Sequence, residues 1–475
     1  MKVNEINLLD IQRGLVVAPA GCGKTHLIVE TLKRHSCGKP TLVLTHTNAG
    51  VAALRGRLDR EGVVPPAYRL ATIDGWAIRI ISTFPKQAGL NPDILNLANP
   101  RADYPSIRDA ALNLLKAGHI NDVLAASYAR LLVDEYQDCS RRQHAIVYYA
   151  AKTLPTCVLG DPLQAIFNFG SDELAKWDAD VCNCFSVAGQ LITPWRWIKS
   201  GAEPLGRWLL DVRQKLLAKK PIDLREAPDG VTWVELDGTN DHAKLLKAAR
   251  IRAPDDKDHV LIIGDSMSAD SRHKIASSTT GAVTVEAVDL RDLVLFAHNL
   301  VLTSPDALQR IADFAQSVMS NVGAADLLRR VKSLKKGTAR KARTKVEGIA
   351  IAFVQEPSHK RVVDLLVEIS KEAGVRTYRP AVMRACIRAL KMCDETQGMS
   401  FLDAAMRVRE QNRLQGRALP KRAVGSTLLL KGLEAEVAVI LNAGDLDSRN
   451  LYVAMTRGSK MLCVCAPSVI LNPTA

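Results

Sequence analysis

A glycine-containing loop near the start of the chain has residue types that bind phosphate. Residues 14–31 read GLVVAPAGCGKTHLIVET, in which a short apolar run leads into a loop and then into a helical pattern. The glycines lack a Cβ, so backbone N–H groups can close around phosphate oxygens, and the helix that follows adds the positive end of its dipole. Lys24 would reach the β and γ phosphates of a nucleotide, and Thr25 would place its hydroxyl on Mg²⁺. The predicted nucleotide-binding residues of this loop are Ala18, Pro19, Ala20, Gly21, Cys22, Gly23, Lys24, Thr25 and His26.

Two acids that follow a second apolar run extend this chemistry. Residues 131–138 read LLVDEYQD, so the run delivers Asp134 and Glu135 at its carboxyl end, where an open α/β sheet keeps its site. Asp134 suits the coordination of Mg²⁺, and Glu135 can polarise the water that attacks a γ-phosphorus. Each segment alone has a plain alternative, a structural Gly-Lys-Thr turn or a solvated acidic turn. Together and in this order they predict an ATPase centre.

Short apolar runs with helical stretches between them would position these residues. Each run is β-rich and unalternating, as in strands that are buried on both faces of a parallel sheet. The runs span residues 14–17, 41–44, 131–133, 157–159, 260–263 and 436–441. This pattern predicts an α/β fold, and the separation of the runs into an early and a late group predicts two α/β lobes.

The region from residue 304 to residue 419 has a different pattern. Its amphipathic stretches, such as 307–320 and 360–373, predict helices, and 348–354 is the one run in it that resembles a strand. It also contains nine cations and no acid within a short segment: Arg329, Arg330, Lys332, Lys335, Lys336, Arg340, Lys341, Arg343 and Lys345. Such a run is either a solvated surface or a phosphate-binding surface.

Composition limits the class of protein. The chain has 475 residues, of which 47% are hydrophobic, and its net charge of +14 points to a polyanionic partner. We find no uncharged apolar run long enough to span a bilayer and no signal peptide, so we expect a cytoplasmic protein. The ten cysteines do not have the spacing of a structural zinc site.

The string DEYQD resembles the second motif of the UvrD/Rep group of superfamily 1A DNA helicases, which reads DExQD. Other segments resemble motifs of this family in the same order. They are AxxGxGKT at 18–25, LTHTNAGVAALRGRL at 44–58, LGDPLQAIFNFG at 159–170, LLLKGLEAEVAVIL at 428–441 and LYVAMTRGSKML at 451–462. The resemblance implies two RecA-like P-loop NTPase lobes with parallel sheets, each carrying a small, mainly helical insertion. It also implies ATP and Mg²⁺ as cofactors.

The resemblance assigns roles around the nucleotide. Arg196 and Arg457 would act as arginine fingers on the γ-phosphate, and Gln164 would sense that phosphate. Glu434 matches the acid that hydrogen-bonds the ribose. Trp195 would stack on adenine or pack in the core. Gln12 is the candidate for reading the adenine edge, although it lies closer to the phosphate loop than in the family.

The resemblance also implies contacts with single-stranded DNA. Phe167 and Phe169 match an aromatic pair that stacks on bases, and Thr45, Thr47 and Asn48 match contacts with the DNA backbone. Trp76, in ATIDGW, lies where the family has THSF; here Asp74 replaces the histidine, and Trp76 is either a DNA contact or a core residue. Lys335, Lys336, Arg340 and Lys341 are the candidates for duplex DNA binding.

The matched motifs imply four structural parts. The first lobe would comprise residues 1–85 and 126–190 with an insertion at 86–125, and the second lobe 191–303 and 420–475 with the basic insertion at 304–419. We expect a DNA-dependent ATPase that translocates 3′ to 5′ on single strands, with unwinding of duplex left open. The alternative is an ATP-gated DNA-end sensor or scaffold.

The short insertions and the short tail after the last motif, with no fused nuclease, resemble the compact helicase subunits of Gabija-type anti-phage systems. This similarity rests on size and architecture. It implies a separate endonuclease as the protein partner.

Overall fold

A computed structural model describes residues 6–35, 38–97, 99–167, 172–287, 289–396, 398–414 and 419–474. The chain forms two compact units. Unit 1 comprises Met1–Trp233, Ala443–Leu462 and Ser468–Ala475, and unit 2 comprises Val234–Asn442 and Cys463–Pro467. The units divide the chain differently from the four expected parts, because residues 191–233 and 443–462 cluster with unit 1. The four-part division remains a prediction.

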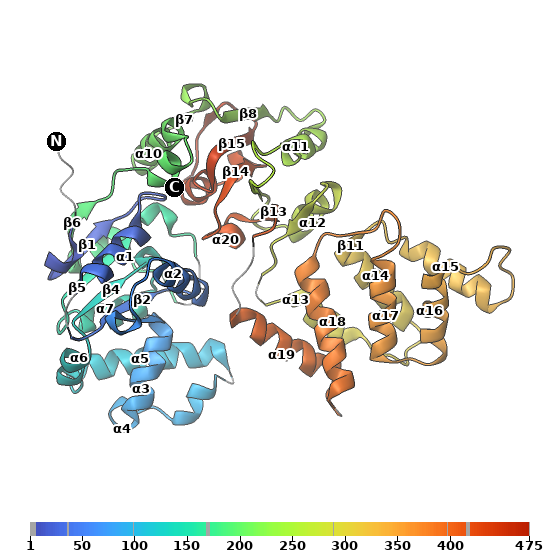
Figure 1. Ribbon diagram of the computed structural model, residues 1–475, viewed down its shortest axis with the longest axis horizontal. Helices are drawn as coiled ribbons and strands as arrows, with labels where there is room; N and C mark the ends of the chain where they lie inside the picture. The colour runs from blue at the N-terminus through green and yellow to red at the C-terminus, as the bar shows by residue number, and fades with distance from the viewer. Residues whose placement is uncertain are drawn as a thin grey trace. The chain divides into compact units, whose positions relative to one another are not determined.

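Unit 1 contains a parallel six-stranded sheet in the order β3-β2-β4-β5-β1-β6 (Figure 1). Gly14 of β1 lies opposite Cys157 of β5, and Val17 lies opposite Gly160. In sheet order, the strands are β3 (Tyr68–Thr72), β2 (Thr41–Thr45), β4 (Arg130–Val133), β5 (Thr156–Gly160), β1 (Arg13–Val17) and β6 (Ser186–Gln190). Because the strands are parallel, the loops after them meet at one edge of the sheet.

Helices cover both faces of this sheet. Neighbouring residues of β1 show the two faces, since Leu15 packs with α3 and α5 whereas Val16 packs with α1 and α2, and both are fully buried. The helices of unit 1 are α1 (Lys24–Arg34), α2 (Asn48–Arg60), α3 (Ile73–Thr83), α4 (Pro85–Ala88), α5 (Pro100–Ala117), α6 (Asn121–Ser127), α7 (Arg141–Ala150), α8 (Cys182–Cys184), α9 (Trp195–Lys199), α10 (Glu203–Leu217) and α21 (Ser448–Met455). The short strands β7 (Ile222–Asp223) and β16 (Ile470–Leu471) pair antiparallel.

Unit 2 contains most of a second six-stranded sheet, in which β10, β13, β9 and β14 are parallel neighbours. In sheet order, the strands are β10 (Ala282–Thr284), β13 (Arg422–Gly425), β9 (Val260–Ile263), β14 (Ala435–Ile440), β15 (Gly458–Ala466) and β8 (Val231–Glu235), and the last two also contribute residues to unit 1. The helices next to it are α11 (Asp241–Ala249), α12 (Ala269–Ser278) and α20 (Thr427–Leu430). The predicted α/β fold is confirmed.

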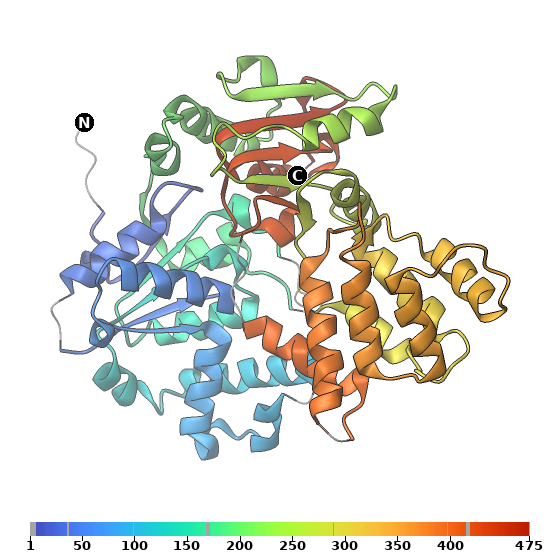
Figure 2. The ribbon, with the colours of Figure 1, turned by 45° about the vertical axis from the view of Figure 1, so that its right-hand side comes forward.

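The remainder of unit 2 is a helical bundle with its own hydrophobic core. Figures 1 and 2 show α14, α16, α17 and α18 running side by side. The helices are α13 (Arg291–Asn299), α14 (Ala307–Val318), α15 (Ala324–Lys335), α16 (Lys345–Gln355), α17 (His359–Ile369), α18 (Pro380–Glu395) and α19 (Phe401–Leu414), with a two-stranded ribbon of β11 (Met319–Ser320) and β12 (Arg376–Thr377). In the part of the chain that the structure describes, no helix is long and apolar enough to cross a membrane.

The expected strand at 348–354 is wrong, because these residues lie within α16. The reason is local. Thr344 accepts a hydrogen bond from the backbone N–H of Glu347, and the Glu347 side chain accepts one from the backbone N–H of Thr344, which together form a capping box. The box satisfies two N–H groups at the helix start, so it favours a helix for an apolar run that also suits a strand.

Candidate functional site

The phosphate-binding loop joins β1 to α1 and contains two glycines in the left-handed backbone region. Gly21 has φ 70° and Gly23 has φ 93°, and α1 begins at Lys24. A Cβ at Gly21 would lie 2.9 Å from Cη2 of Trp197, and a Cβ at Gly23 would lie 3.0 Å from Cδ1 of Trp195. Both positions therefore require glycine for backbone conformation and for space. Phosphate binding by this loop remains a prediction.

Lys24 lies between the two acids that follow β4. Its Nζ is 3.0 Å from Oδ1 of Asp134 and also donates to Oε1 of Glu135. Burial lowers the pKa of the Lys24 ammonium, but the two carboxylates outweigh this and raise the pKa above its ordinary value. Lys24 is therefore charged at neutral pH. The structure brings the three residues together as the sequence predicts.

Glu135 adopts a left-handed backbone with φ 54°. For a residue with a Cβ this conformation costs about 1–2 kcal/mol and persists only where its surroundings fix it. Its N–H donates to Oδ1 of Asp134 at 3.0 Å, and its Oε2 accepts from Nε2 of Gln137 at 2.5 Å. Hydrogen bonds thus hold both the backbone N–H and the side chain of this strained residue.

A buried polar network follows β5, and its central residues were missed at the sequence level. Asp161 accepts hydrogen bonds from Nη2 of Arg213 at 2.8 Å and from Nε2 of Gln164 at 3.3 Å. Its backbone N–H donates to Oε1 of Gln137 at 3.1 Å. The GDP and DEYQD strings contain Asp161 and Gln137, but Arg213 lies in α10 within an ordinary amphipathic pattern. No local signal could have identified Arg213.

The α9 helix joins the phosphate loop to the end of α21. The backbone N–H of Arg196 donates to Gly21 O at 3.0 Å, and its Nη1 donates to Thr456 O at 2.6 Å. Arg457 follows directly, is buried, and donates from Nε to Val453 O at 2.8 Å. Both predicted arginine fingers therefore belong to unit 1, the unit that contains Lys24.

Other residues around the phosphate loop support its shape. The hydroxyl of Tyr452, in α21, accepts from the backbone N–H of Ala20 at 3.2 Å. Ala18 and Pro19 are buried, and His26 is exposed. Burial raises the pKa of the Cys22 thiol to about 12, so this thiol stays protonated and unreactive at neutral pH.

The candidates for nucleoside contacts have different placements. Trp195 is 47% exposed beside Gly23, which excludes its core alternative. Glu434 is exposed just before β14 in unit 2. Gln12 does not fit its predicted role of reading adenine. It precedes β1 at the amino end, where its carbonyl accepts from Thr156 N, whereas the phosphate loop lies at the carboxyl end, five residues or about 16 Å along the strand.

The predicted contacts with the DNA backbone follow β2. Thr47 caps α2 by accepting from the backbone N–H of Gly50 at 3.0 Å, and Asn48 is exposed in the first turn. Thr45 is only 1% exposed, so its side chain does not fit a DNA contact. The ring of Phe167 lies 5.6 Å from that of His46, a residue that the sequence prediction did not include. Phe169 lies outside the described residues.

Trp76 belongs to the core and not to a DNA surface. Its side chain in α3 is 1% exposed and packs among the apolar residues beneath the sheet, so the predicted DNA contact is corrected. Asp74 also forms an ion pair within unit 1. Arg108 donates from Nε to Oδ1 of Asp74 at 2.8 Å and from Nη2 to Oδ2 at 2.7 Å. Arg108 also pairs with Asp172, so the two acids share its charge.

The basic segment forms the end of α15, a loop and the start of α16. Three of its cations make ion pairs, since Arg329 pairs with Asp326, Arg330 with Glu347 and Lys345 with Glu368. Among the described residues, the four candidates for duplex binding are exposed and make no ion pair. These candidates are Lys335, Lys336, Arg340 and Lys341. Their charges are available to a polyanion.

Thr25 and Asp134 have the oxygen donors that Mg²⁺ prefers. Over the described ranges, no three His, Cys, Asp or Glu side chains gather into a metal site. Mg²⁺ is usually held by one or two protein groups, waters and nucleotide phosphates.

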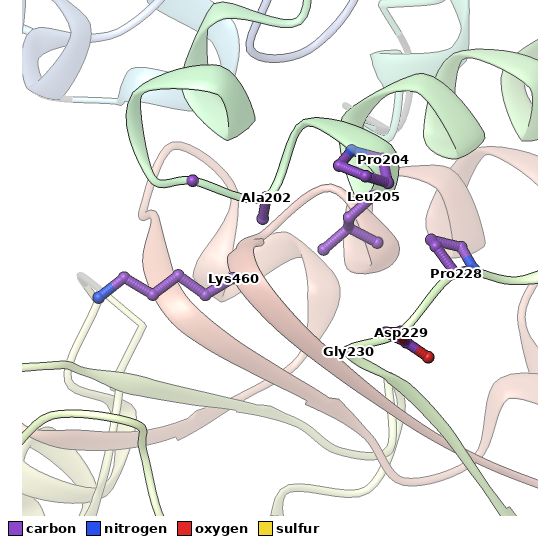
Figure 3. Close-up of a pocket in the computed structure, with 8 residues that line it drawn as sticks. Ala202, Pro204, Leu205, Pro228, Asp229, Gly230 and Lys460 are labelled. Carbon is purple, nitrogen blue, oxygen red and sulfur yellow. The ribbon is translucent and has the colours of Figure 1, made fainter.

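A pocket of about 430 Å³ lies elsewhere in unit 1, and its lining residues are drawn in Figure 3. Gly201, Ala202, Pro204 and Leu205 line it from the start of α10, and Pro228, Asp229, Gly230 and Lys460 complete it. In Figure 3 the Lys460 side chain extends away from Asp229. No residue predicted to contact nucleotide or DNA lines this pocket.

The fold and the site define a class of protein. A glycine-containing loop after one parallel strand and paired acids after another, joined through one lysine, are the arrangement of P-loop nucleotide-binding proteins. Residues 96–175 match the family model described as the UvrD/REP helicase N-terminal domain. This stretch includes Asp134, Glu135 and Gln164, and is less than half of the chain.

No curated protein matches the chain. Among solved structures, the crystal structure of Pif1 helicase from Candida albicans is similar, with 11% identity, a TM-score of 0.41, and coverage of 98% of this chain and 94% of that chain. A similarity at this level carries no weight for fold or function.

Proposed function

We propose that this protein is a DNA-dependent ATPase of the UvrD/Rep type, which hydrolyses ATP to translocate 3′ to 5′ on single-stranded DNA. The observation that carries the proposal is the contact of Lys24 with both Asp134 and Glu135 beneath a phosphate-binding loop. The match of residues 96–175 to a UvrD/REP helicase domain supports the choice of ATP and DNA. The polarity rests on the motif resemblance.

Each group has a role in hydrolysis. The N–H groups of the glycine loop and Lys24 bind the phosphates, and Glu135 orients the attacking water and accepts its proton. Thr25 and Asp134 would hold Mg²⁺, which supplies positive charge to the β and γ phosphate oxygens. Arg196 and Arg457 stabilise the negative charge that develops on the γ-phosphate. A bound phosphate competes with Asp134 and Glu135 for the ammonium of Lys24.

The direct test is ATP hydrolysis with and without single-stranded DNA, together with strand displacement on 3′-tailed, 5′-tailed and blunt duplexes. We expect hydrolysis that DNA stimulates and displacement of the 3′-tailed duplex. The absence of ATP hydrolysis under both conditions would overturn the proposal. Displacement of the 5′-tailed duplex alone would reverse the polarity, and hydrolysis without displacement would favour the ATP-gated sensor. A separate nuclease and a role in defence rest on size and architecture and remain predictions.

Reversing the charges of the four candidate residues in the basic segment is expected to weaken duplex binding. Each lost phosphate contact makes the slope of log K against log salt less negative by about 0.9, so the loss of four contacts makes it less negative by roughly 3–4. The variant changes Lys335, Lys336, Arg340 and Lys341 to glutamate, and duplex affinity is measured between about 50 and 200 mM salt.

The matched control has the same change in net charge at other exposed lysines: Lys219, Lys220, Lys247 and Lys257. If both variants flatten the salt dependence equally, the effect comes from overall charge and the segment is a solvated surface.

A further inference from the structure

The side-chain amide of Gln137 connects the ends of two strands. It is 3% exposed in the turn after β4. Its Nε2 donates to Oε2 of Glu135 at 2.5 Å, and its Oε1 accepts from the backbone N–H of Asp161, after β5, at 3.1 Å. Both ends of one amide are therefore used, and a shorter side chain could not reach both partners.

The two oxygens of Glu135 have different partners. Oε1 accepts from Lys24, whereas Oε2 accepts from Gln137. On the proposed function, a nucleotide phosphate draws Lys24 away from Oε1, while the hydrogen bond from Gln137 continues to hold Oε2. Because the left-handed backbone of Glu135 does not by itself settle where its side chain lies, this contact sets the position from which the acid acts on water.

Oε1 of the Gln137 amide is connected through Asp161 to Gln164, the predicted phosphate sensor. Asp161 is fixed by Arg213 and accepts a hydrogen bond from Nε2 of Gln164. Gly160, just before it, leaves the necessary space, since a Cβ there would lie 2.6 Å from Oε1 of Gln137 and 3.1 Å from its backbone N. Residue 160 must therefore be glycine for the amide to reach Asp161.

We infer that Gln137 is a positioning residue for ATP hydrolysis. It holds the Glu135 carboxylate for the attack of water and joins it to the segment that contains Gln164. This inference rests on the proposed ATPase function and deepens it. Gln137 acts through Glu135 and Asp161, the two residues that its side-chain amide contacts.

Gln137→Met tests this role, because methionine fills a similar volume but cannot hydrogen-bond both partners. We expect kcat for ATP to fall about 10- to 100-fold, the range for losing a hydrogen bond to a charged group, and KM for ATP to change less than about twofold. The control is Gln143→Met in α7. Gln143 is also a buried amide with two partners, Ser140 N and Asp74, but it does not touch Glu135. The Gln143→Met variant should lose thermal stability and keep kcat within about twofold of the wild-type value.

A double variant separates positioning from folding. If Gln137 acts through Glu135, then adding Gln137→Met to Glu135→Gln should lower the residual kcat no further, because interacting residues are not additive. Gly160→Ala should lower kcat as Gln137→Met does, since the added methyl displaces the amide. An unchanged kcat in Gln137→Met would overturn the inference. So would an equal fold-loss of kcat when Gln137→Met is added to the wild type and to Glu135→Gln. If the wild-type protein does not hydrolyse ATP, the proposed function fails first and separately.

Discussion

Replacing Glu135 by glutamine is expected to lower kcat for ATP hydrolysis by about 10²- to 10⁴-fold. The amide cannot accept the proton of the attacking water, whereas its size is almost that of the carboxylate. Lys24, Thr25 and the glycine loop are unchanged, so ATP and DNA should still bind. Turnover is measured by phosphate release, and binding by the anisotropy of a fluorescent ATP analogue and of labelled single-stranded DNA.

The matched control is Glu61→Gln. Glu61 is an exposed acid of unit 1 that pairs with Lys33 at 2.9 Å and has no part in the site. This variant should hydrolyse ATP at the wild-type rate. Wild-type turnover in Glu135→Gln would show that Glu135 is not the general base. Loss of nucleotide binding together with turnover would instead indicate a collapsed site.

Replacing Arg213 by methionine should have the largest effect on stability. Arg213 is 2% exposed and Asp161 is 1% exposed, and the guanidinium donates twice to Oδ1 of Asp161, at 2.8 and 3.1 Å. Removal of the cation leaves a buried carboxylate without its charge partner, which typically costs about 3–5 kcal/mol. The free energy of unfolding is measured by urea denaturation followed by circular dichroism.

Arg207→Met on the same helix is the comparison for this variant. Arg207 is exposed and pairs with Glu203 one turn away at 2.5 Å, and such surface pairs contribute about 0.3–0.5 kcal/mol. Its unfolding free energy should therefore stay close to that of the wild type. Equal losses in the two variants would mean that water or a neighbouring group compensates Asp161 and that the pair is not needed for stability.

The local sequence pattern was sufficient to predict much of the fold. All six apolar runs became strands, as β1, β2, β4, β5, β9 and β14. Unalternating β-branched runs next to glycines and acids have few other conformations open to them in a parallel sheet. The strand expected at 348–354 failed because apolar content alone cannot distinguish a short buried strand from a buried helix, and the capping box decided the outcome.

The positions of the candidate residues in the fold decided which of them can contact a ligand. Trp76 and Thr45 have types that suit DNA contacts, but both are 1% exposed. Gln12 has the right type but lies at the wrong end of β1. A sequence specifies the type of a residue and its distance along the chain. Its solvent exposure, and the edge of the sheet at which it lies, depend on packing between distant elements.

By itself, the sequence determined the phosphate loop, the paired acids and the parallel strands that carry them, because each depends on residues that are neighbours along the chain. Only the tertiary structure decided how these residues are held. Arg213 is 52 positions from Asp161, and Lys24 is 111 positions from Glu135. Buried polar groups are nearly always hydrogen-bonded, and the charged partners of these acids come from distant elements. The distant charged partners of Glu135, Asp161 and Asp74, which are Lys24, Arg213 and Arg108, were therefore visible only in the folded chain.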